Sequence, residues 1–443
     1  MEQPDLLVQP ASATGRSSLR QGIPDRQLCF CPRRPPMKVL ISAYACETGR
    51  GSEGEIAWRL VLELAKRHEI SVITRANLRT IHEEAFRRDG RPPNLEFIYF
   101  DLPWIFRFYK KGRRFFLLYY YLWQVGSGLL ARRLQRATAY DLCHHLTGGM
   151  DWMPAGLALA QGPLLWGPVG SEDTHPVLRR RLSATSRLKD RLRVIARYAM
   201  RYLDPLVLIS GRRADRILSH TPETMPRHLA GKMLPFTQTG IEETPSMVQP
   251  KADLSRGGEL RLLFAGEFKD WKGALLALQA ALRFFENDPS ARLTMVGDGP
   301  LRSEIARMVA AHLHGDRVVI TGRLDMAGLV EALNRSDVFL YPSFHHGLST
   351  VVLQAMLTGL PVVCLEGDAT GRTVKQEAGI TVALRHDRDP VADFAAAIRR
   401  LALDETYRQS LARSAQTIAR KRHAYAALAS SMDQIYQDTG SRS

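Results

Sequence analysis

Short runs of β-branched and aromatic residues alternate with longer amphipathic stretches along most of the chain. In the first half, stretches of helical periodicity such as Glu55–Arg67 lie between most of these runs. The runs are residues 37–44, 69–74, 95–100, 140–146, 163–169 and 215–220. Alternation of this kind predicts a parallel sheet with helices on both faces.

The same pattern starts again after a polar connector. The second set of runs comprises residues 261–268, 292–298, 316–322, 337–343, 360–365 and 379–384. Each of the first five precedes a helical stretch, as in the first half. Two such units in succession predict an α/β fold of two Rossmann-like domains facing across a cleft, where sheets of this type bind ligands.

By these patterns the chain divides into five parts. Residues 1–36 are rich in Pro, Ser, Gln and Arg without apolar periodicity, which predicts a disordered extension. The first Rossmann-like domain is expected at 37–240, a linker at 241–259 and the second domain at 260–415. Residues 416–443 are expected to form a C-terminal helix that can cross back to the first domain, followed by a tail.

Composition narrows the class of protein. The chain has 443 residues, of which 45% are hydrophobic and 24% charged, and these proportions exclude a disulfide-stapled miniprotein and wholesale disorder. Its five cysteines have no paired zinc spacing and suit a reducing cytoplasm. No signal peptide or spanning helix is evident. The net charge of +16 favours an anionic partner: nucleic acid, an acidic membrane or a phosphate-bearing ligand.

The strongest candidate site lies in residues 341–365. A strand is expected to end at Tyr341, and after a loop Ser349 can cap a helix that stops at Gly359. The backbone N–H groups of Leu348, Ser349 and Thr350 would then be free at a helix N-terminus, where they can bind an anion. The alternative is an ordinary strand–helix–strand step without a ligand.

This segment resembles the signature PSxxEGxxxxxxEAMxxGxPVV of retaining glycosyltransferases of the GT-B fold, family 4. The matching positions are Pro342, Ser343, Gly347, Ala355, Met356, Gly359, Pro361, Val362 and Val363. The resemblance implies a nucleotide-sugar site. It places His346 beside the donor sugar and Gln354 at the ribose hydroxyls, where the family has glutamates. An amide can still hydrogen-bond a diol, and a histidine can contact a sugar hydroxyl or phosphate.

Residues 262–273 resemble the family segment whose Arg and Lys neutralise the donor diphosphate. Lys272 matches the lysine, which implies a diphosphate contact, whereas Glu267 stands at the arginine position. A carboxylate there repels a diphosphate unless Arg323 or Lys269 substitutes for the missing cation. Arg323 lies in a segment that resembles the part of the family site facing the base. The alternative for Lys272 is a solvated surface lysine.

The loop at residues 44–58 contains a GxGxxG pattern. A dinucleotide site is one interpretation, with Arg75 on the 2′-phosphate of NADP, although four residues separate the strand from Gly49 and no acidic ribose ligand follows. The preferred interpretation is that it resembles the glycine-rich first loop of GT-B transferases. Gly51 and Ser52 would then lie nearest to the donor phosphates.

Two further features concern the donor sugar and the membrane. The resemblance implies a histidine near the donor sugar at the end of the strand in 140–146, and we assign it to His145, with a structural histidine as the alternative. The basic, aromatic-rich stretches 104–136 and 178–203 fit docking to an anionic bilayer. Solvated helices with a buried aromatic side, or single-stranded nucleic-acid binding, would use similar residues.

The sequence therefore predicts a retaining glycosyltransferase of hexosyltransferase type. It would move a sugar from a nucleotide diphosphate sugar to a hydroxyl acceptor, such as a lipid-linked saccharide in bacterial polysaccharide or glycolipid assembly, with His145, His346 and Lys272 as catalytic candidates. We expect no metal, no further cofactor and no nucleic-acid partner, and a peripheral location on the inner face of the plasma membrane. The alternative is a catalytically impaired GT-B pseudo-enzyme that acts as a binding partner, because Glu267, His346 and Gln354 depart from the family pattern.

Overall fold

The computed structural model describes residues 35–49, 53–106, 115–171, 184–247, 259–288, 290–344, 347–375, 377–385 and 387–441. The extension predicted at residues 1–36 lies almost wholly outside the described residues. By its contacts the chain divides into Met1–Pro36 and one compact unit, Met37–Ser443, which holds two parallel sheets. The domain boundaries expected within this unit remain predictions.

The first sheet has seven strands in the order β3-β2-β1-β4-β5-β6-β7. They are β1 (Lys38–Ser42), β2 (Glu69–Arg75), β3 (Leu95–Phe100), β4 (Leu142–His145), β5 (Leu164–Val169), β6 (Arg216–Ser219) and β7 (Met233–Pro235). The first six confirm the strands predicted in the first half of the chain. β7 was not predicted, since three residues ending in proline carry no periodicity.

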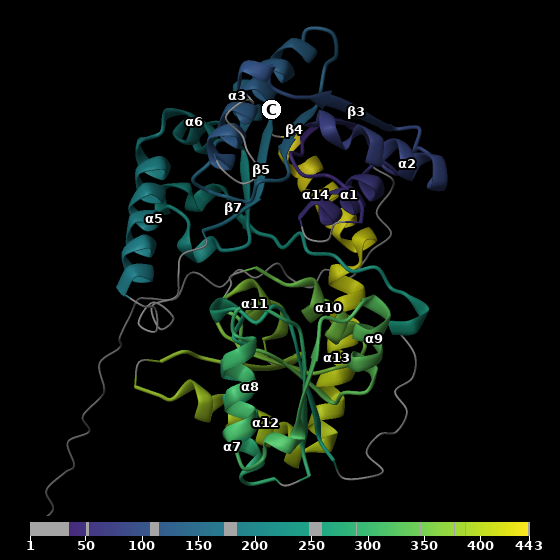
Figure 1. The fold of residues 1–443 in the computed structure, drawn as a ribbon. Helices are drawn as coiled ribbons and strands as arrows, with labels where there is room; N and C mark the ends of the chain where they lie inside the picture. Colours follow the sequence, from purple (N-terminus) through teal and green to yellow (C-terminus); the bar gives the residue numbers. More distant parts are fainter. Residues whose placement is uncertain are drawn as a thin grey trace, which may run out of the picture. The chain divides into compact units, whose positions relative to one another are not determined.

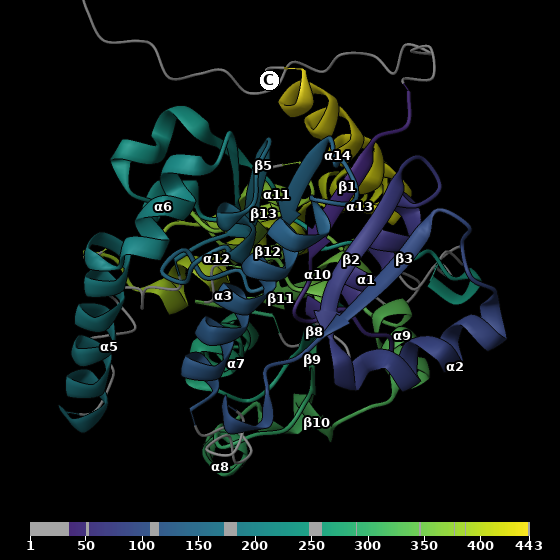
Figure 2. The ribbon, with the colours of Figure 1, turned by 90° about the horizontal axis from the view of Figure 1, so that it is seen from above.

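Helices cover both faces of this sheet (Figure 2). Helices α1 (Glu53–Leu64) and α14 (Tyr425–Gly440) pack on one face, and α3 (Phe116–Leu134) packs on the other. The remaining helices of this half are α2 (Arg79–Asp89), α5 (Ala184–Leu203) and α6 (Pro205–Arg213). Successive residues of each strand face opposite layers, so the two cores share a sheet but not side chains.

The second sheet has six strands in the order β10-β9-β8-β11-β12-β13. They are β8 (Arg261–Ala265), β9 (Arg292–Val296), β10 (Val318–Gly322), β11 (Val338–Tyr341), β12 (Val362–Leu365) and β13 (Gly379–Val382). All six were predicted from the apolar runs.

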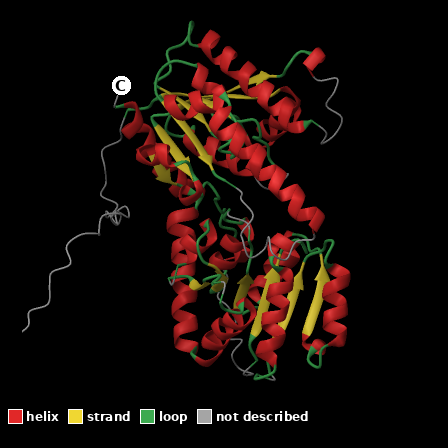
Figure 3. Cartoon of the chain, turned by 90° about the vertical axis from the view of Figure 1, so that its left-hand side faces the viewer, coloured by secondary structure: helices red, strands yellow, loops and turns green. Residues whose placement is uncertain are grey.

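The second sheet is also enclosed by helices (Figures 1 and 3). One face is covered by α7 (Ala274–Phe285), α8 (Arg302–Ala311) and α12 (Pro390–Leu403). The other face is covered by α9 (Met326–Asn334), α10 (Thr350–Leu357), α11 (Ala369–Val374) and α13 (Glu405–His423). The predicted α/β fold of two Rossmann-like units is confirmed.

The C-terminal stretch forms two helices. α13 packs with the second sheet, and the chain turns at Ala424, whose φ of −59° and ψ of 139° interrupt the helix. α14 then packs in the core of the first sheet, where the Tyr436 hydroxyl lies 2.7 Å from Nδ1 of His144 on β4. The C-terminal segment therefore has buried contacts with the elements that begin the fold.

Candidate functional site

The second sheet has a topological switch point at its centre. From the adjacent strands β8 and β11, the chain proceeds outward in opposite directions, through β9 and β10 on one side and β12 and β13 on the other. The loops after β8 and β11 therefore diverge at the carboxyl edge of the sheet, which is where open parallel sheets bind ligands. Both motifs singled out in the second half of the sequence are in these loops.

These two loops are joined by direct contacts. Trp271 of the short 3₁₀ helix Asp270–Lys272 accepts a hydrogen bond at its carbonyl oxygen from the Phe344 N–H, at 2.8 Å. Gly273 follows with a φ of +74°, and a Cβ atom there would lie 2.0 Å from the Pro342 carbonyl oxygen. Only glycine permits this approach. Lys272 is consequently held beside the loop that leads into α10.

Three cations surround the acidic residue that departs from the family pattern. Glu267 forms an ion pair of 2.8 Å with Lys269, and that hydrogen bond is the main reason why the pKa of its carboxyl lies below its usual range. The charges of Arg323 and Lys272 lower the pKa further. In the described part of the chain, neither Arg323 nor Lys272 has an ion-pair partner within 4.0 Å. Two cations thus remain available to an anion while Lys269 neutralises Glu267.

The start of α10 forms the next wall of the site. Ser349 is at the N-cap position, as predicted, but its side chain makes no capping hydrogen bond. The preceding loop is held by Thr239, whose hydroxyl donates to the Leu348 carbonyl at 2.9 Å, and by Thr370, whose hydroxyl donates to the Gly347 carbonyl at 3.3 Å. Among the described residues, the N–H groups of Leu348, Ser349 and Thr350 have no backbone or side-chain acceptor. They form the array of unpaired donors that the sequence predicts.

Gln354 is on the same helix and is almost buried, with 5% of its surface exposed. Its Nε2 lies 3.3 Å from the Met326 sulfur, which is a weak acceptor that a ligand oxygen could replace. His346, the other altered position, lies outside the described residues. Seven of the predicted donor contacts therefore lie at one edge of the sheet: Lys272, Arg323, Gln354 and residues 347–350.

The loop after β9 supports the Glu267 loop. Gly297 has a φ of +146°, and a Cβ atom on it would lie 1.9 Å from the Gly266 carbonyl oxygen. The Phe268 N–H donates to the Asp298 carbonyl at 3.0 Å. The glycines of this segment therefore serve close backbone packing, which fixes the loop that carries Glu267 and Lys269.

In the first sheet, the glycine-rich loop follows β1 at the corresponding switch point beside β4. Gly51 and Ser52 lie outside the described residues. Arg75, the last residue of β2, already has two partners within the protein. It donates to the Tyr44 carbonyl at 2.8 Å and pairs with Glu47 at 2.8 Å. An arginine bound in this way does not hold the 2′-phosphate of NADP.

A carboxylate also occupies the start of α1. Glu53 Oε1 accepts hydrogen bonds from the N–H groups of Gly148, at 2.6 Å, and Gly149, at 3.2 Å. In a dinucleotide-binding fold the pyrophosphate is held at this helix N-terminus. A glutamate there repels it, so the structure speaks against the dinucleotide interpretation. Glu53 instead connects α1 to the loop after β4, a role that the GxGxxG pattern did not indicate.

The two adjacent histidines of β4 point to opposite faces of the sheet. His144 is held between the Tyr436 hydroxyl and the Gly167 carbonyl, the latter at 2.8 Å. His145 shares a row with Ser42 and Trp166 on the face covered by α3. Burial lowers the pKa of His145 to about 3, and its Nδ1 has no hydrogen-bond partner in the described structure.

His145 therefore lies beneath the surface, with 2% of its area exposed. Its neutral imidazole retains one unused nitrogen in a dry environment. The catalytic role assigned to it from the resemblance stays a prediction.

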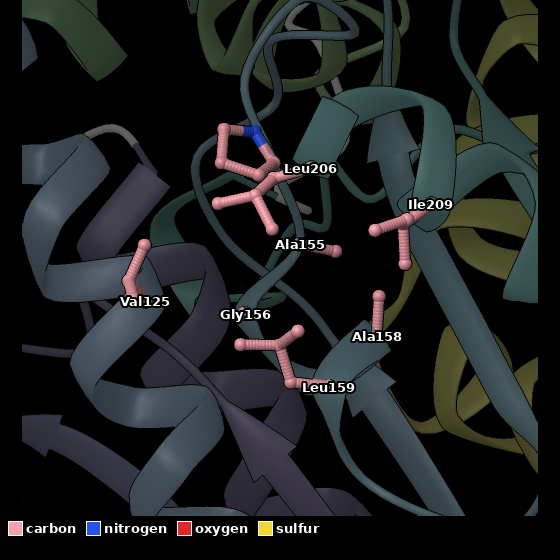
Figure 4. A pocket seen from close by; sticks show the side chains of 8 residues that line it. Val125, Ala155, Gly156, Ala158, Leu159, Leu206 and Ile209 are labelled. Atoms are coloured by element: carbon pink, nitrogen blue, oxygen red, sulfur yellow. The ribbon is translucent and has the colours of Figure 1, made fainter. Parts of the chain in front are cut away.

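Other features of the described structure bear on ligands only indirectly. Figure 4 shows an apolar pocket among α3, α6 and the 3₁₀ helix Gly156–Leu159, lined by residues such as Val125, Leu159 and Ile209. Its space of about 10 Å³ holds roughly one water molecule and no nucleotide.

No group of three or more His, Cys, Asp or Glu side chains with metal-binding geometry occurs among the described residues. None of the described helices has the length and apolar character needed to cross a bilayer.

Comparison with known proteins relates this geometry to a family. Residues 259–404 match the family model described as glycosyl transferases group 1. Over 281 residues the chain is 28% identical to the 2-deoxystreptamine N-acetyl-D-glucosaminyltransferase of Streptomyces fradiae, covering 58% of this chain and 62% of the relative. The chain spans about half of the length of the first curated relatives it matches, 46% and 62%.

Solved structures extend the likeness to both sheets. Sucrose-phosphate synthase from Thermosynechococcus elongatus has a TM-score of 0.59 at 19% identity, covering 93% of this chain and all of that structure. The Anabaena protein HepE, solved in complex with UDP and glucose, has a TM-score of 0.52 at 16% identity, covering 90% of this chain and 99% of that structure. These likenesses show the GT-B fold, and the match over residues 259–404 identifies the part of the chain that resembles the glycosyltransferase family.

Proposed function

We propose that the protein is a glycosyltransferase that moves a hexose from a nucleotide diphosphate sugar to a hydroxyl acceptor. The observation that carries the proposal is the junction of the Lys272 turn with the loop before α10, at the switch point of the second sheet. There two unpaired cations, three free N–H groups and Gln354 come together. Cations and a helix N-terminus are suited to a diphosphate, and an almost buried amide is suited to a diol.

The proposed mechanism proceeds with retention and is electrostatic. Lys272, Arg323 and the N-terminus of α10 stabilise the negative charge that grows on the leaving diphosphate as the glycosidic bond breaks. The acceptor hydroxyl gives its proton to a phosphate oxygen as its own oxygen bonds to the anomeric carbon. No protein nucleophile is needed, because orientation and charge stabilisation supply the rate enhancement. The Anabaena neighbour solved with UDP and glucose supports a nucleotide sugar as donor.

The acceptor that we propose is a lipid-linked saccharide of bacterial polysaccharide or glycolipid assembly. The enzyme would then work as a peripheral protein on the anionic inner face of the plasma membrane. Two observations support this location: the excess of basic residues and the exposed apolar side chains of the first half, which include Trp104, Phe115 and Leu118. Basic and apolar groups together favour the interface of an anionic bilayer.

Nucleotide binding tests the donor site. Thermal-shift measurements with UDP, GDP, ADP and their sugars should reveal one preferred nucleotide, because a ligand that binds the folded state raises the melting temperature. Gln354→Ala should weaken that binding by ~1–3 kcal/mol, since it removes a partner of buried hydroxyls. Gln409→Ala, on the exposed side of α13, is the matched control. Equal affinity of wild type and Gln354→Ala would refute the assigned site.

A catalytically impaired binding protein of the same fold is the second candidate. It is favoured by one observation: the charge that the family motif carries is reversed at Glu267 and is absent at His346 and Gln354. The two candidates separate when a nucleotide sugar is incubated with the protein and lipid-linked acceptors. Tight nucleotide binding without release of nucleoside diphosphate, across all donors and acceptors, would favour the binding protein.

A further inference from the structure

Helix α5 exposes its apolar face to solvent. Its exposed apolar side chains, each with between 43% and 77% of its surface accessible, are Leu188, Leu192, Ile195, Tyr198, Tyr202 and Leu203. They recur at the spacing of one helix face, which in a soluble protein is normally the face that packs on the core. Figures 1 and 2 both show α5 beside α6 at the periphery of its half of the fold.

The face of α5 that meets the protein is charged. Asp190 and Arg201 are buried on this face, and Arg197 is partly buried. Arg201 Nη2 lies 2.6 Å from Asp151 Oδ2, with 3% and 0% of the two side chains exposed. A buried ion pair thus ties the helix to the loop after β4. The amphipathic orientation is inverted, so the sequence-based alternative of a solvated helix with a buried aromatic side is wrong for α5.

The charge of α5 indicates the chemistry of its partner. The helix carries six basic side chains and one acidic side chain, and Arg187, Lys189, Arg191 and Arg193 are exposed beside the apolar stripe. Two copies of α5 packed together would place these basic groups near each other at a cost. An anionic lipid surface instead accepts both features, because its headgroups attract the basic groups while the acyl boundary accepts the apolar ones.

We propose that α5 is the docking element of this protein on an anionic bilayer, lying in the interface with Leu188, Leu192 and Ile195 towards the acyl chains. The proposal rests on the membrane location in the proposed function but not on sugar transfer. Asp151 is on the loop after His145, at the carboxyl end of β4. Docking of α5 would therefore also hold the carboxyl ends of the strands of the first sheet near the membrane, where a lipid-linked acceptor lies. The ion pair of Arg201 with Asp151 connects α5 to this loop.

Sedimentation of the full chain with vesicles tests the proposal. Wild type should bind vesicles that contain phosphatidylglycerol far more strongly than vesicles of phosphatidylcholine alone, and added salt should weaken binding because it screens the attraction. The double variant Leu192→Gln/Ile195→Gln should bind at least about tenfold more weakly, since two side chains lose their apolar insertion. The double variant Leu313→Gln/Leu403→Gln, which changes two exposed leucines outside α5, is the matched control and should bind like wild type.

Two further measurements decide what a negative result means. Light scattering gives the molar mass of wild type and of the α5 variant; a dimer that becomes a monomer in the variant would overturn the proposal in favour of a second copy as the partner. Undiminished vesicle binding by the α5 variant, or no binding by wild type, would overturn it as well. Nucleotide thermal shifts are measured on the same samples: if they persist while vesicle binding is absent, the docking proposal fails and the donor site stands.

Discussion

At the scale of single residues, Glu267 illustrates how a carboxylate is accommodated beside an anion site. The ammonium group of Lys269 neutralises the carboxylate of Glu267 through their hydrogen bond, and the nearby Arg323 and Lys272 keep the surrounding potential positive. Its pKa is lowered, so the carboxylate stays ionised at neutral pH and remains paired. The site therefore loses one cation relative to the family motif without gaining an uncompensated negative charge.

Replacing this residue tests the arrangement. Glu267→Arg should strengthen binding of the preferred nucleoside diphosphate, because it adds a cation and releases Lys269 from its partner. Titration calorimetry at low and high salt measures the gain, which should shrink as salt increases. Glu69→Arg is the matched control: Glu69 is an exposed carboxylate paired with a lysine, Lys38, at 3.4 Å. If both variants bind nucleotide like wild type, Glu267 does not face the diphosphate, and the role of Lys272 must be reassigned.

Motif spacing was sufficient to locate residues but not to describe their surroundings. The sequence identified Lys272, Gln354 and the helix start at Ser349, because glycine and proline positions in these motifs fix the chain path locally. The ion pair of Lys269 with Glu267 depends on side-chain rotamers, and the burial of His145 depends on how the preceding helix α3 packs on the sheet. Such contacts are set by tertiary packing and leave no local pattern.

At the scale of elements, α5 shows what periodicity can and cannot reveal. The spacing of Leu188, Leu192 and Ile195 predicts an apolar stripe, and the helix is present. Periodicity does not tell which way the stripe faces. The sequence allowed docking to a bilayer or a solvated helix with a buried aromatic side, and the exposed stripe contradicts the second of these for α5. The deciding contact is a buried ion pair between α5 and a loop about 50 residues earlier in the chain, which no local pattern encodes.

The ion pair yields a test of how α5 is attached. Arg201→Met should destabilise the fold by about 3–5 kcal/mol, since it breaks an ion pair of 2.6 Å whose carboxylate is fully buried. Arg201→Met combined with Asp151→Leu should recover much of this loss, because neither charge of the pair is then left buried without the other. Urea unfolding of the wild type, both single variants and the double variant gives the coupling free energy. A coupling near zero would mean that other contacts hold α5 in place.

At the scale of the whole molecule, the sequence predicted the fold well because its signals are repeated. Each of twelve apolar runs became a strand, and the order of the runs with helices between them allows few topologies. Two features escaped the pattern. β7 is too short for periodicity, and the C-terminal helix expected in residues 416–443 is interrupted at Ala424, where the chain passes from one core to the other without proline or glycine to mark the turn.

Several buried histidines should make the stability of the whole fold sensitive to acid. Burial lowers the pKa of His144 and His423 to about 4 and that of His145 to about 3, whereas an unfolded histidine titrates near pH 6.5. Between about pH 6.5 and 4, the unfolded chain therefore binds protons that the folded chain excludes. As the pH decreases through this window, the free energy of unfolding should decrease by about 1.4 kcal/mol per pH unit for each such histidine.

Urea unfolding at a series of decreasing pH values measures this slope. The variant His144→Gln should make the slope shallower by the contribution of one histidine, whatever its effect on stability at neutral pH. A free energy that stays constant from neutral pH to about pH 5 would show that these imidazoles are protonated in the folded state, and the buried hydrogen bond of His144 with Tyr436 would then have to tolerate a charge.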